Sequence, residues 1–494
     1  MNANLISPYP NADPARLTDN NPLTRPIILQ DILNIIKQFK SNSPGTSNIS
    51  KAIMNKLPNQ AIIILKDIFN STLSLGYFPA KFKHAKIILI PKPNTKGTNP
   101  TEYRPISLLE VPGKVLEKII NSRLRNYLET HNILPINQHG FRCNRGTDTA
   151  LAITTELIAD ALSSKKQCHL VLRDVSKAFD KVWHNGLKFK IAQLQLPDIT
   201  TKLLCSFLDN RSANISISHH NGLPFQLHSG VPQGTSLSPT LYALYTSDIP
   251  AASAGSTNIL YADDITQIVT HPSKSKKIMA RRTQYEIIKI NNYEKQWKIR
   301  TNTSKFKIIP IASKKTEPIT VNNMNIPYAK DGIILGLRVN KTGIINHVTH
   351  TRNKANYALS TIRRFHSMHT RIKLRQVKVF VSPILTYPSY PLNSISKSST
   401  LKLQRILNKS LRFAHNQRYP YTHTTAELHR LSSMAPLNIT LDNRGKKTRN
   451  KLTNIIQDPE YIRILTTNDQ HEHSYFRKSF LKLNNPEPPP LFTV

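Results

Sequence analysis

Several features that would define common classes of protein are scarce or missing in this sequence of 494 residues. The three cysteines, Cys143, Cys168 and Cys205, form neither a CxxC pair nor any other zinc-ligand spacing. A disulfide framework and a zinc finger are therefore excluded, and a reducing compartment is indicated. No apolar run approaches the roughly 20 residues that a membrane-spanning helix needs, and no basic region followed by an apolar stretch marks a secretion signal. We expect a protein of the nucleus or the cytoplasm, without choosing between them, that has no membrane partner and is not secreted.

Acidic residues are also scarce. The sequence has 29 Asp and Glu against 68 Lys and Arg, which gives a formal net charge of +39 at pH 7. Biased codon usage would favour Lys over Arg, but it would not explain the shortage of acids. So large a charge predicts a polyanionic partner. Because the basic residues are spread along the whole chain, nucleic acid fits better than a membrane surface.

The spacing of apolar residues predicts alternating helices and strands. A short apolar run over 85–90, ended by Pro91, predicts a strand, and from His169 to Val269 strands alternate with helices in an α+β pattern. Beyond Gly336 the pattern changes to basic amphipathic helices. The ranges with helical spacing are 27–39, 53–75, 112–131, 147–163, 352–365, 374–380 and 401–413.

Two stretches place carboxylates at the ends of predicted strands. His169–Asp174 is a buried strand that ends in Asp174, and the pattern after it predicts a helix over 175–183. Asn258–Val269 has the pattern of a β-hairpin with Asp263 and Asp264 at its tip. Asp is a common turn residue, so the hairpin alone is ambiguous. Three acids at strand ends, however, predict a site for hard divalent cations, Mg²⁺ or Mn²⁺, which remove the repulsion between adjacent acids.

The stretches that carry these acids resemble a known family. In order along the chain, 173–180 (RDVSKAFD), 230–239 (GVPQGTSLSP) and 261–264 (YADD) are similar to the successive palm motifs of reverse transcriptases. Flanking stretches resemble those of non-long-terminal-repeat retrotransposons of the jockey-like sort. These stretches are 90–93, 103–108, 137–142, 145–147, 334–336, 384–387 and 401–405, and the resemblance covers roughly residues 25 to 440.

The resemblance implies an α+β fold with a right-hand polymerase architecture. In this architecture the fingers and palm have an antiparallel sheet packed on helices, and the thumb is mostly helical. The predicted parts are a disordered lead-in (1–26), a helical N-terminal extension (27–84), fingers (85–168), a palm with the catalytic motifs (169–345), a helical thumb and C-terminal region (346–457) and a flexible tail (458–494).

The resemblance also implies an activity. The chain would be an RNA-directed DNA polymerase that extends a DNA primer on an RNA template, in target-primed reverse transcription. Asp174, Asp263 and Asp264 would be catalytic, and together with the backbone carbonyl of Val175 they would hold two Mg²⁺ ions, or Mn²⁺ in their place. The expected partners are the RNA template, the DNA primer, target DNA and dNTPs. The residues implied to bind the nucleotide are Lys92, Arg104, Phe179, Gln233, Gly234 and Lys305.

Some residues near these motifs have simpler explanations. Asp180, expected on the helix after Asp174, is assigned a capping or packing role rather than a catalytic one, and His139 a structural role. Without the motif around it, Phe179 would be interpreted as a core aromatic residue. Because it stands in the motif, the resemblance implies that its ring excludes the 2′-hydroxyl of ribonucleotides. Lys305 would act as a general acid to pyrophosphate, although Lys307 is close by.

The sequence departs from the family at two places, and it leaves other functions open. Arg173 stands where the family has an apolar residue, so it needs a partner or solvent, and the stretch 387–390 lacks the usual Trp. No endonuclease, zinc knuckle or ribonuclease H set is recognisable, which suggests a truncated element. The alternatives are an impaired relic that only binds nucleic acid, an intron-type reverse transcriptase and an RNA-templated RNA polymerase. The sequence does not indicate the oligomeric state, the host or the template.

Overall fold

The computed structural model describes residues 21–455, apart from 40–41, 94, 96, 218–219, 312–316, 322–323, 342 and 394. The predicted flexible tail and residues 1–20 of the predicted lead-in lie outside the described residues. The chain forms two compact units that alternate along the sequence. The first unit contains the chain up to Pro135 together with Val175–Pro250 and Asn291–Thr301, and the second contains Ile136–Asp174, Ala251–Ile290 and the chain from Asn302 onward.

The first unit is built on a sheet in which strands β2, β1, β4 and β5 are neighbours in that order and β6 also pairs with β4. Strands β1 and β2 form an antiparallel pair, whereas β1 and β4 are parallel. The strands are β1 (Ala85–Pro91), β2 (Tyr103–Leu108), β4 (Arg211–Ile217), β5 (His220–Asn221) and β6 (Phe225–Leu227).

Helices make up most of the rest of the first unit. Two of these helices end or begin with residues typical of helix termini. Gly76 follows the last residue of α3 in the left-handed conformation, and Pro112 lies in the first turn of α5. The helices are α1 (Leu29–Gln38), α2 (Lys51–Met54), α3 (Asn59–Leu75), α4 (Ala80–Lys83), the 3-10 turn η1 (Pro100–Glu102), α5 (Val111–Thr130), α7 (His184–Gln193), α8 (Asp198–Leu208) and α9 (Ser238–Tyr245).

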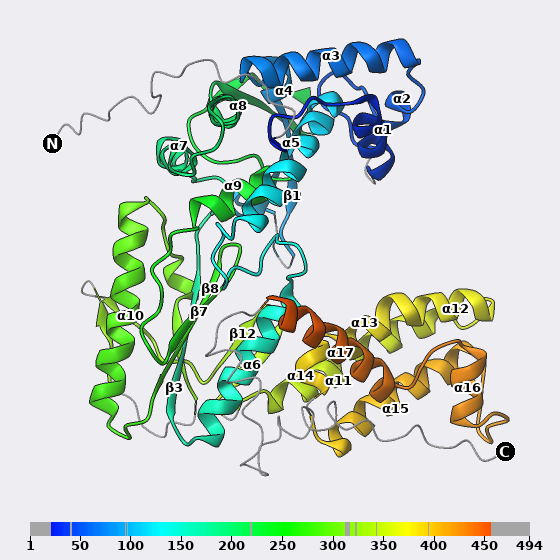
Figure 1. Cartoon of the computed structure of the whole chain (residues 1–494). Coiled ribbons are helices and arrows are strands. Elements are labelled where there is room, and N and C mark those ends of the chain that lie inside the picture. The colour runs from blue at the N-terminus through cyan, green and yellow to red at the C-terminus, as the bar shows by residue number, and fades with distance from the viewer. Residues whose placement is uncertain are drawn as a thin grey trace. The chain divides into compact units, whose positions relative to one another are not determined.

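The second unit is built on an antiparallel sheet with the strand order β7-β8-β3-β9. The central strand β3 is buried on both faces because its side chains alternate between two helices. Leu170 packs in the core that includes α6, whereas Val171 packs in the core that includes α10 (Figure 1). The elements around this sheet are α6 (Thr147–Ser163), β3 (Gln167–Asp174), β7 (Ser256–Tyr261), β8 (Asp264–His271), α10 (Lys276–Gln296, whose last turns belong to the first unit), the 3-10 turn η2 (Thr303–Lys305) and β9 (Lys307–Ile311).

Two small strand pairs and a helical region complete the second unit. The helices enclose an apolar core of their own, which includes Leu359, Val381, Leu407 and Leu411. The elements are β10 (Thr320–Val321), β11 (Met324–Asn325), β12 (Asp331–Ile334), β13 (Leu337–Asn340), α11 (Ile345–Ile362), η3 (Arg363–Phe365), α12 (Thr370–Gln376), the π-helical turn η4 (Val377–Val381), α13 (Ser382–Thr386), α14 (Ser389–Asn393), α15 (Lys397–Ala414), α16 (Thr425–Leu431) and α17 (Leu437–Ile455).

Most predicted elements are confirmed, among them the strand that begins at Ala85, the hairpin around Asp263 and the helix over 147–163. Two predictions were wrong. The predicted helix over 53–75 is two helices, because Pro58 precedes α3 and separates it from α2. The predicted helix over 175–183 is a series of turns, because its backbone pairs with distant segments instead.

The α+β class is confirmed by the mixture of helices and strands, and the right-hand polymerase architecture by the sheet and helices that it requires. An antiparallel sheet packed on helices holds the predicted palm motifs, and the basic C-terminal helices form a separate apolar core. The boundaries predicted for fingers, palm and thumb stay predictions. Among the described helices, none combines the length and the apolar character needed to cross a membrane.

Candidate active site

The second unit brings the three predicted carboxylates together. Asp174 is the last residue of β3, and its Cα pairs with that of Asp264, the first residue of β8. Asp263 lies in the tight turn that joins β7 to β8. The two acids that end β3 and begin β8 are thus direct neighbours across the sheet, although Asp174 and Asp264 are 90 positions apart in the sequence. This juxtaposition confirms that the strand ends meet, as the sequence predicted.

The turn that carries Asp263 is held by a segment far away in sequence. Ala262 has a φ of 57°, and its backbone N–H donates to Oε1 of the buried Gln138 at 3.1 Å. The same oxygen accepts from the N–H of Gly140 at 2.9 Å. A Cβ atom on Gly140 would lie 2.4 Å from the backbone nitrogen of Ala262, so only glycine fits there. The motif 137–142 therefore supports the turn that carries Asp263.

The carboxylates repel one another, and this is visible in their pKa values. Burial raises the pKa of Asp264 to about 6, and the charges of Asp263 and Asp174 add to the shift. Burial also raises the pKa of Asp263, and Asp174 adds to this effect while Lys305 opposes it. The site therefore concentrates negative charge that a cation would relieve.

Two groups from η2 and its cap hold Asp174. The ammonium Nζ of Lys305 lies 3.0 Å from its Oδ1, and Asn302 donates its backbone N–H to the carbonyl oxygen of Asp174 at 2.7 Å. The side-chain nitrogen of Asn302 lies 3.4 Å from Oδ2. Sequence reasoning predicted Lys305 but missed Asn302. Asn302 could have been found from its position three residues before Lys305, because Asn is a common capping residue and Asn302 caps η2.

The donor set fits hard divalent cations, which prefer carboxylate and carbonyl oxygens. Asp174, Asp263 and Asp264 supply such oxygens at one end of the sheet. Within the described residues, no three His, Cys, Asp or Glu side chains already form a metal cluster. The ion pair between Lys305 and Asp174 occupies one of the carboxylate oxygens instead. Binding of cations would thus compete with this ion pair.

The remaining predicted residues lie in the first unit. Lys92 follows β1 and Arg104 lies on β2, and both are exposed on the same hairpin, where Ile90 pairs with Arg104. The Nζ of Lys92 donates to the carbonyl of Thr101 at 2.8 Å. The hairpin thus presents two cations close together in the fold, although eleven residues separate them in the sequence.

The loop with Gln233 and Gly234 lies against this hairpin. Ser107 of β2 donates its N–H to the carbonyl of Gln233 at 2.8 Å. Gly234 has a φ of 97°, which favours glycine, and a Cβ there would lie 3.1 Å from Ile106. The side-chain nitrogen of Gln233 donates to Oδ1 of Asp180 at 2.6 Å.

Asp180 differs from its sequence prediction. It lies in a turn rather than on a helix, and burial raises the pKa of its carboxyl, while the hydrogen bond from Gln233 and the charge of Lys177 oppose the shift. The packing role is compatible with this placement, but the helix-capping role is not. Its partner could not be read from the sequence because the two residues are 53 positions apart.

Phe179 and Val175 also lie in the turns after β3. The ring of Phe179 is half-buried and stacks on that of Tyr242 in α9, with centroids 5.1 Å apart. The carbonyl oxygen of Phe179 accepts from the N–H of Val231 at 2.7 Å. Val175 forms an isolated β-bridge with Thr301. Phe179 is therefore fixed by α9 and the loop before it, not by a helix of its own.

Two residues of uncertain role in the sequence are structural. Arg173 is 3% exposed, its guanidinium lies 4.6 Å from the ring centroid of Phe306, and it donates to the carbonyl of Ile287 at 3.4 Å, so this buried cation has partners within the fold. His139 is 1% exposed and its Nδ1 lies 2.9 Å from the hydroxyl of Thr149. Burial lowers the pKa of His139 to about 3, and it is therefore neutral at physiological pH.

Known proteins are similar to this chain. Residues 90–330 match the family model described as reverse transcriptase (RNA-dependent DNA polymerase). The chain is 30% identical over 424 residues to a probable RNA-directed DNA polymerase from transposon BS of Drosophila melanogaster, covering 82% of this chain and 46% of that protein. It is 28% identical over 443 residues to the RNA-directed DNA polymerase from mobile element jockey of the same species, covering 86% and 48%. The chain spans about half the length of the curated relatives it matches.

Among solved structures, apo telomerase from Candida Tropicalis is similar with a TM-score of 0.41 and 12% identity, covering 88% of this chain and 73% of that one. The range of the family match includes every predicted palm motif and both Lys92 and Arg104. The relatives from transposon BS and jockey extend the similarity to most of the chain. Residues 90–330 thus form a reverse transcriptase region, and most of the chain is similar to the polymerases of jockey-like non-long-terminal-repeat retrotransposons.

Proposed function

We propose that this chain is an RNA-directed DNA polymerase that extends a DNA primer on an RNA template. One observation carries the proposal: the fold pairs Asp174 with Asp264 and places Asp263 in the adjoining turn. Oxygen ligands held at the end of a buried sheet are rigidly aimed and still reachable by substrate. The match of residues 90–330 to the reverse transcriptase family supports the same activity.

In the proposed reaction, the primer 3′-hydroxyl gives up its proton to solvent water, and its oxygen forms a bond to the α-phosphorus of a dNTP. The bond from that phosphorus to the bridging α–β oxygen breaks, and pyrophosphate leaves. Asp174, Asp263, Asp264 and the carbonyl of Val175 would hold two Mg²⁺ ions, with Mn²⁺ as a substitute. Such ions supply a lowered hydroxyl pKa and neutralise the triphosphate charge. The residues of this chain contribute the aimed oxygens, and Lys305 would give the departing pyrophosphate its proton.

Cations and a loop of the first unit would bind the nucleotide. Arg104 can meet phosphate oxygens with two parallel hydrogen bonds, and Lys92 adds a point charge. The Gln233–Gly234 loop lies against the strand that carries Arg104, so we propose that it contacts the same nucleotide. Its partner Asp180 orients the amide of Gln233.

The process in which the chain acts and its nucleic-acid partners are also proposals. The relatives are polymerases of mobile elements, and a basic chain with a net charge of +39 suits long nucleic acids. We propose that the chain acts in target-primed reverse transcription, with the RNA template, the DNA primer and target DNA as partners. The charge is spread along the chain, as contacts to several nucleic-acid strands require.

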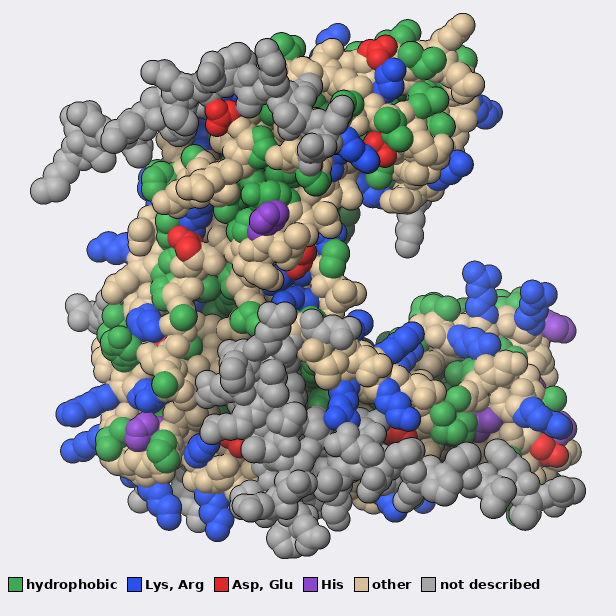
Figure 2. Space-filling view, viewed as in Figure 1, with side chains coloured by type: hydrophobic (Ala, Val, Ile, Leu, Met, Phe, Trp, Pro, Cys, Tyr) green, Lys and Arg blue, Asp and Glu red, His purple; other side chains and the backbone are tan. Residues whose placement is uncertain are grey.

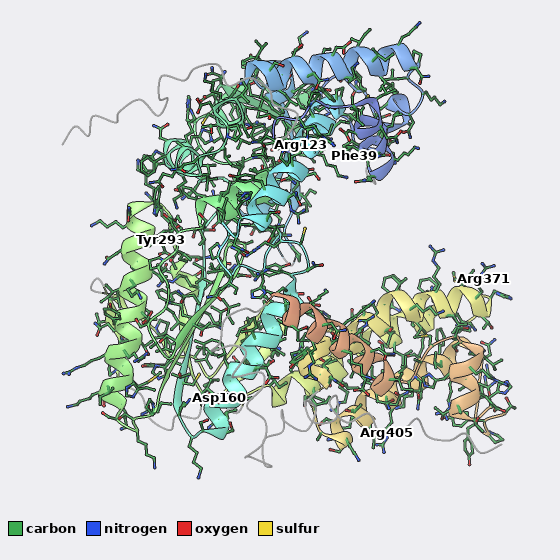
Figure 3. The ribbon with its side chains drawn as sticks, viewed as in Figure 1. Phe39, Arg123, Asp160, Tyr293, Arg371 and Arg405 are labelled. Carbon is green, nitrogen blue, oxygen red and sulfur yellow. The ribbon has the colours of Figure 1, made fainter. Side chains whose placement is uncertain are left out.

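Primer extension tests the activity. The native chain, Asp263→Asn and Asp160→Asn are each given a labelled DNA primer annealed to an RNA template, dNTPs and Mg²⁺. Asp160→Asn is the matched control, because this acid lies on α6 in the same unit and pairs with Lys166 at 3.2 Å (Figure 3). We expect Asp263→Asn to lose more than about a hundredfold in rate, since loss of an outer-shell partner alone costs about 10- to 100-fold.

Template–primer binding should survive in Asp263→Asn, because phosphate contacts lie elsewhere. A native extension rate in this variant would overturn the site. Extension with rNTPs in preference to dNTPs would point instead to an RNA-templated RNA polymerase. Nucleic-acid binding without extension in the native chain would identify an impaired relic.

A further inference from the structure

A basic pocket lies in the C-terminal helical part of the second unit, away from the three carboxylates in sequence. It is a cavity of about 430 Å³ between the end of η3, the end of α15 and the loop that follows α15. We call it the α15 pocket. Its cationic lining residues are Arg363, Lys409, Arg412 and Arg418, and its aromatic lining residues are Phe413 and Tyr421. Among the described residues, no acidic side chain lines it.

The helical region around the α15 pocket is strongly basic. Residues 346–457 contain 20 Lys and Arg and two acids, Glu427 and Asp442. Figure 2 shows Lys and Arg side chains over these helices. Glu427 is engaged in capping α16, where its Oε2 accepts from the N–H of Thr424 at 2.7 Å. The cations of the pocket are therefore not neutralised by this acid, and an anionic ligand would relieve their mutual repulsion.

The walls of the pocket are preformed. The fully buried Lys373 donates to the carbonyl of His366 at 3.2 Å and to the side chain of Asn416, which ties the two walls together. Gln417 closes the loop, because its Oε1 accepts from the N–H groups of Thr422 at 3.1 Å and His423 at 3.3 Å. A preformed pocket binds without the cost of ordering its loops.

Aromatic rings give the pocket a second chemistry besides charge. The guanidinium of Arg412 stacks 3.9 Å from the ring centroid of Tyr421. Tyr419 packs edge-on against Tyr421 with centroids 5.8 Å apart, and the two rings are 86% and 48% exposed. Exposed rings among cations are the usual platform on which unpaired bases stack. A duplex hides its base faces, so contacts to a duplex would need the cations alone.

We propose that the α15 pocket binds an unpaired nucleotide of a single nucleic-acid strand. The phosphate lies against the arginines and the base stacks in the layer formed by Arg412 and Tyr421. The volume fits this ligand, since pockets for small organic groups span about 300–1,000 Å³ and a phosphate alone needs far less. The chain would thus hold a single-stranded segment at a site separate from the metal-binding carboxylates.

Binding assays without catalysis test the proposal. Fluorescence anisotropy is measured in EDTA without dNTPs, so that failure of the polymerase proposal cannot affect the result. The probes are a short single-stranded RNA, the DNA of the same sequence, the RNA with abasic sites, and the RNA fully paired with complementary DNA. The pocket variants are Tyr421→Ala and Arg418→Gln, which change exposed side chains.

Two exposed residues of the same unit serve as matched controls. Tyr357→Ala removes a 75% exposed tyrosine on α11, and Arg405→Gln removes an exposed arginine on α15 that does not line the pocket (Figure 3). We expect Tyr421→Ala to weaken binding of the single-stranded RNA about tenfold, a typical effect of removing one stacking ring. Binding of the duplex and of the abasic strand should change by less than about twofold, since neither offers a base to stack.

Arg418→Gln should weaken single-strand binding and lower its salt slope by about 0.7, the contribution of one phosphate contact. Equal affinity for the RNA and DNA probes would show that the pocket recognises the phosphate and the base but not the sugar. Tighter binding of one probe would show whether the pocket takes an RNA strand or a DNA strand. The proposal is overturned if Tyr421→Ala behaves like Tyr357→Ala, or if it weakens duplex and single strand equally.

Discussion

Phe179 lies five residues beyond Asp174, in a turn, and its ring is fixed by stacking on Tyr242. A bulky ring held in this way can exclude a 2′-hydroxyl by its volume rather than by lost affinity. Apolar pockets discriminate against an added hydroxyl by only about a hundredfold through affinity, so steric exclusion is the stronger device. We expect Phe179→Val to reduce the dNTP-to-rNTP preference by more than about tenfold, with a modest loss in dNTP insertion.

Single-nucleotide insertion kinetics check this expectation. Phe189→Val is the control, because it removes a 47% exposed phenylalanine from α7 of the same unit. If the dNTP-to-rNTP preference of Phe179→Val equals that of the native chain, Phe179 only packs in the core and does not select the sugar.

His139 lies in the segment that supports the turn with Asp263, and its buried ring makes the stability of the fold depend on pH. Its pKa is about 3 in the folded chain against an ordinary value of 6.5, so protonation favours the unfolded state. The stability that the neutral ring contributes is complete above pH 6.5 and is lost as pH falls from 6.5 towards 3. Between pH 7 and pH 5 this loss amounts to about 2 kcal/mol.

We therefore expect the urea midpoint of the native chain to fall between pH 7 and pH 5 by more than that of His139→Gln. Glutamine stays neutral and can still bond to Thr149. His131→Gln, at an exposed histidine, is the control and should follow the native chain. The same pH dependence in native and His139→Gln chains would contradict this role.

At the scale of elements, the β7–β8 hairpin depends on the segment that contains Gly140. A methyl group on Gly140 would meet backbone atoms of Ala262 and Tyr261, which cannot move without shifting Asp263. A displacement of about 1 Å at a catalytic group can cost about a hundredfold in rate. We expect Gly140→Ala to lose about that much in single-turnover extension while it still binds template–primer.

Gly222→Ala is the matched control for the added methyl group. Its Cβ would lie 3.3 Å from the carbonyl of Ile215, and Gly222 is exposed just after β5, in the connection to β6. Extension by Gly140→Ala at the native rate would show that the hairpin does not need this close approach.

At the scale of the whole molecule, the net charge of +39 should dominate binding to nucleic acid. Each phosphate that the chain neutralises on duplex DNA releases counterions and adds about −0.9 to the slope of log affinity against log salt. We expect a slope steeper than about −4 for duplex DNA, measured by anisotropy over a range of salt concentrations. A flat response would show that the cations do not contact phosphates.

Features that depend on local pattern were predictable. The apolar run of β3, the apolar arms of the β7–β8 hairpin and the ordered motifs placed Asp174, Asp263 and Asp264 at the ends of predicted strands from the sequence alone. Local pattern suffices there because a buried strand or a hairpin is specified by neighbouring residues. The family resemblance then connected the two strand ends.

Tertiary structure decided what depends on distant partners. The segment after Asp174 has helical spacing, yet Ser176 donates to Arg300, and Phe179 and Val182 accept from Val231 and Gly230. These long-range hydrogen bonds replace those of a helix, so the segment forms turns. The same reason applies to the contacts of Gln138 with the turn that carries Asp263 and of Asn302 with Asp174. The sequence by itself determined which acids stand at the ends of strands, and only the tertiary structure decided what holds them in place, because backbone groups pair with whichever partner the fold brings near.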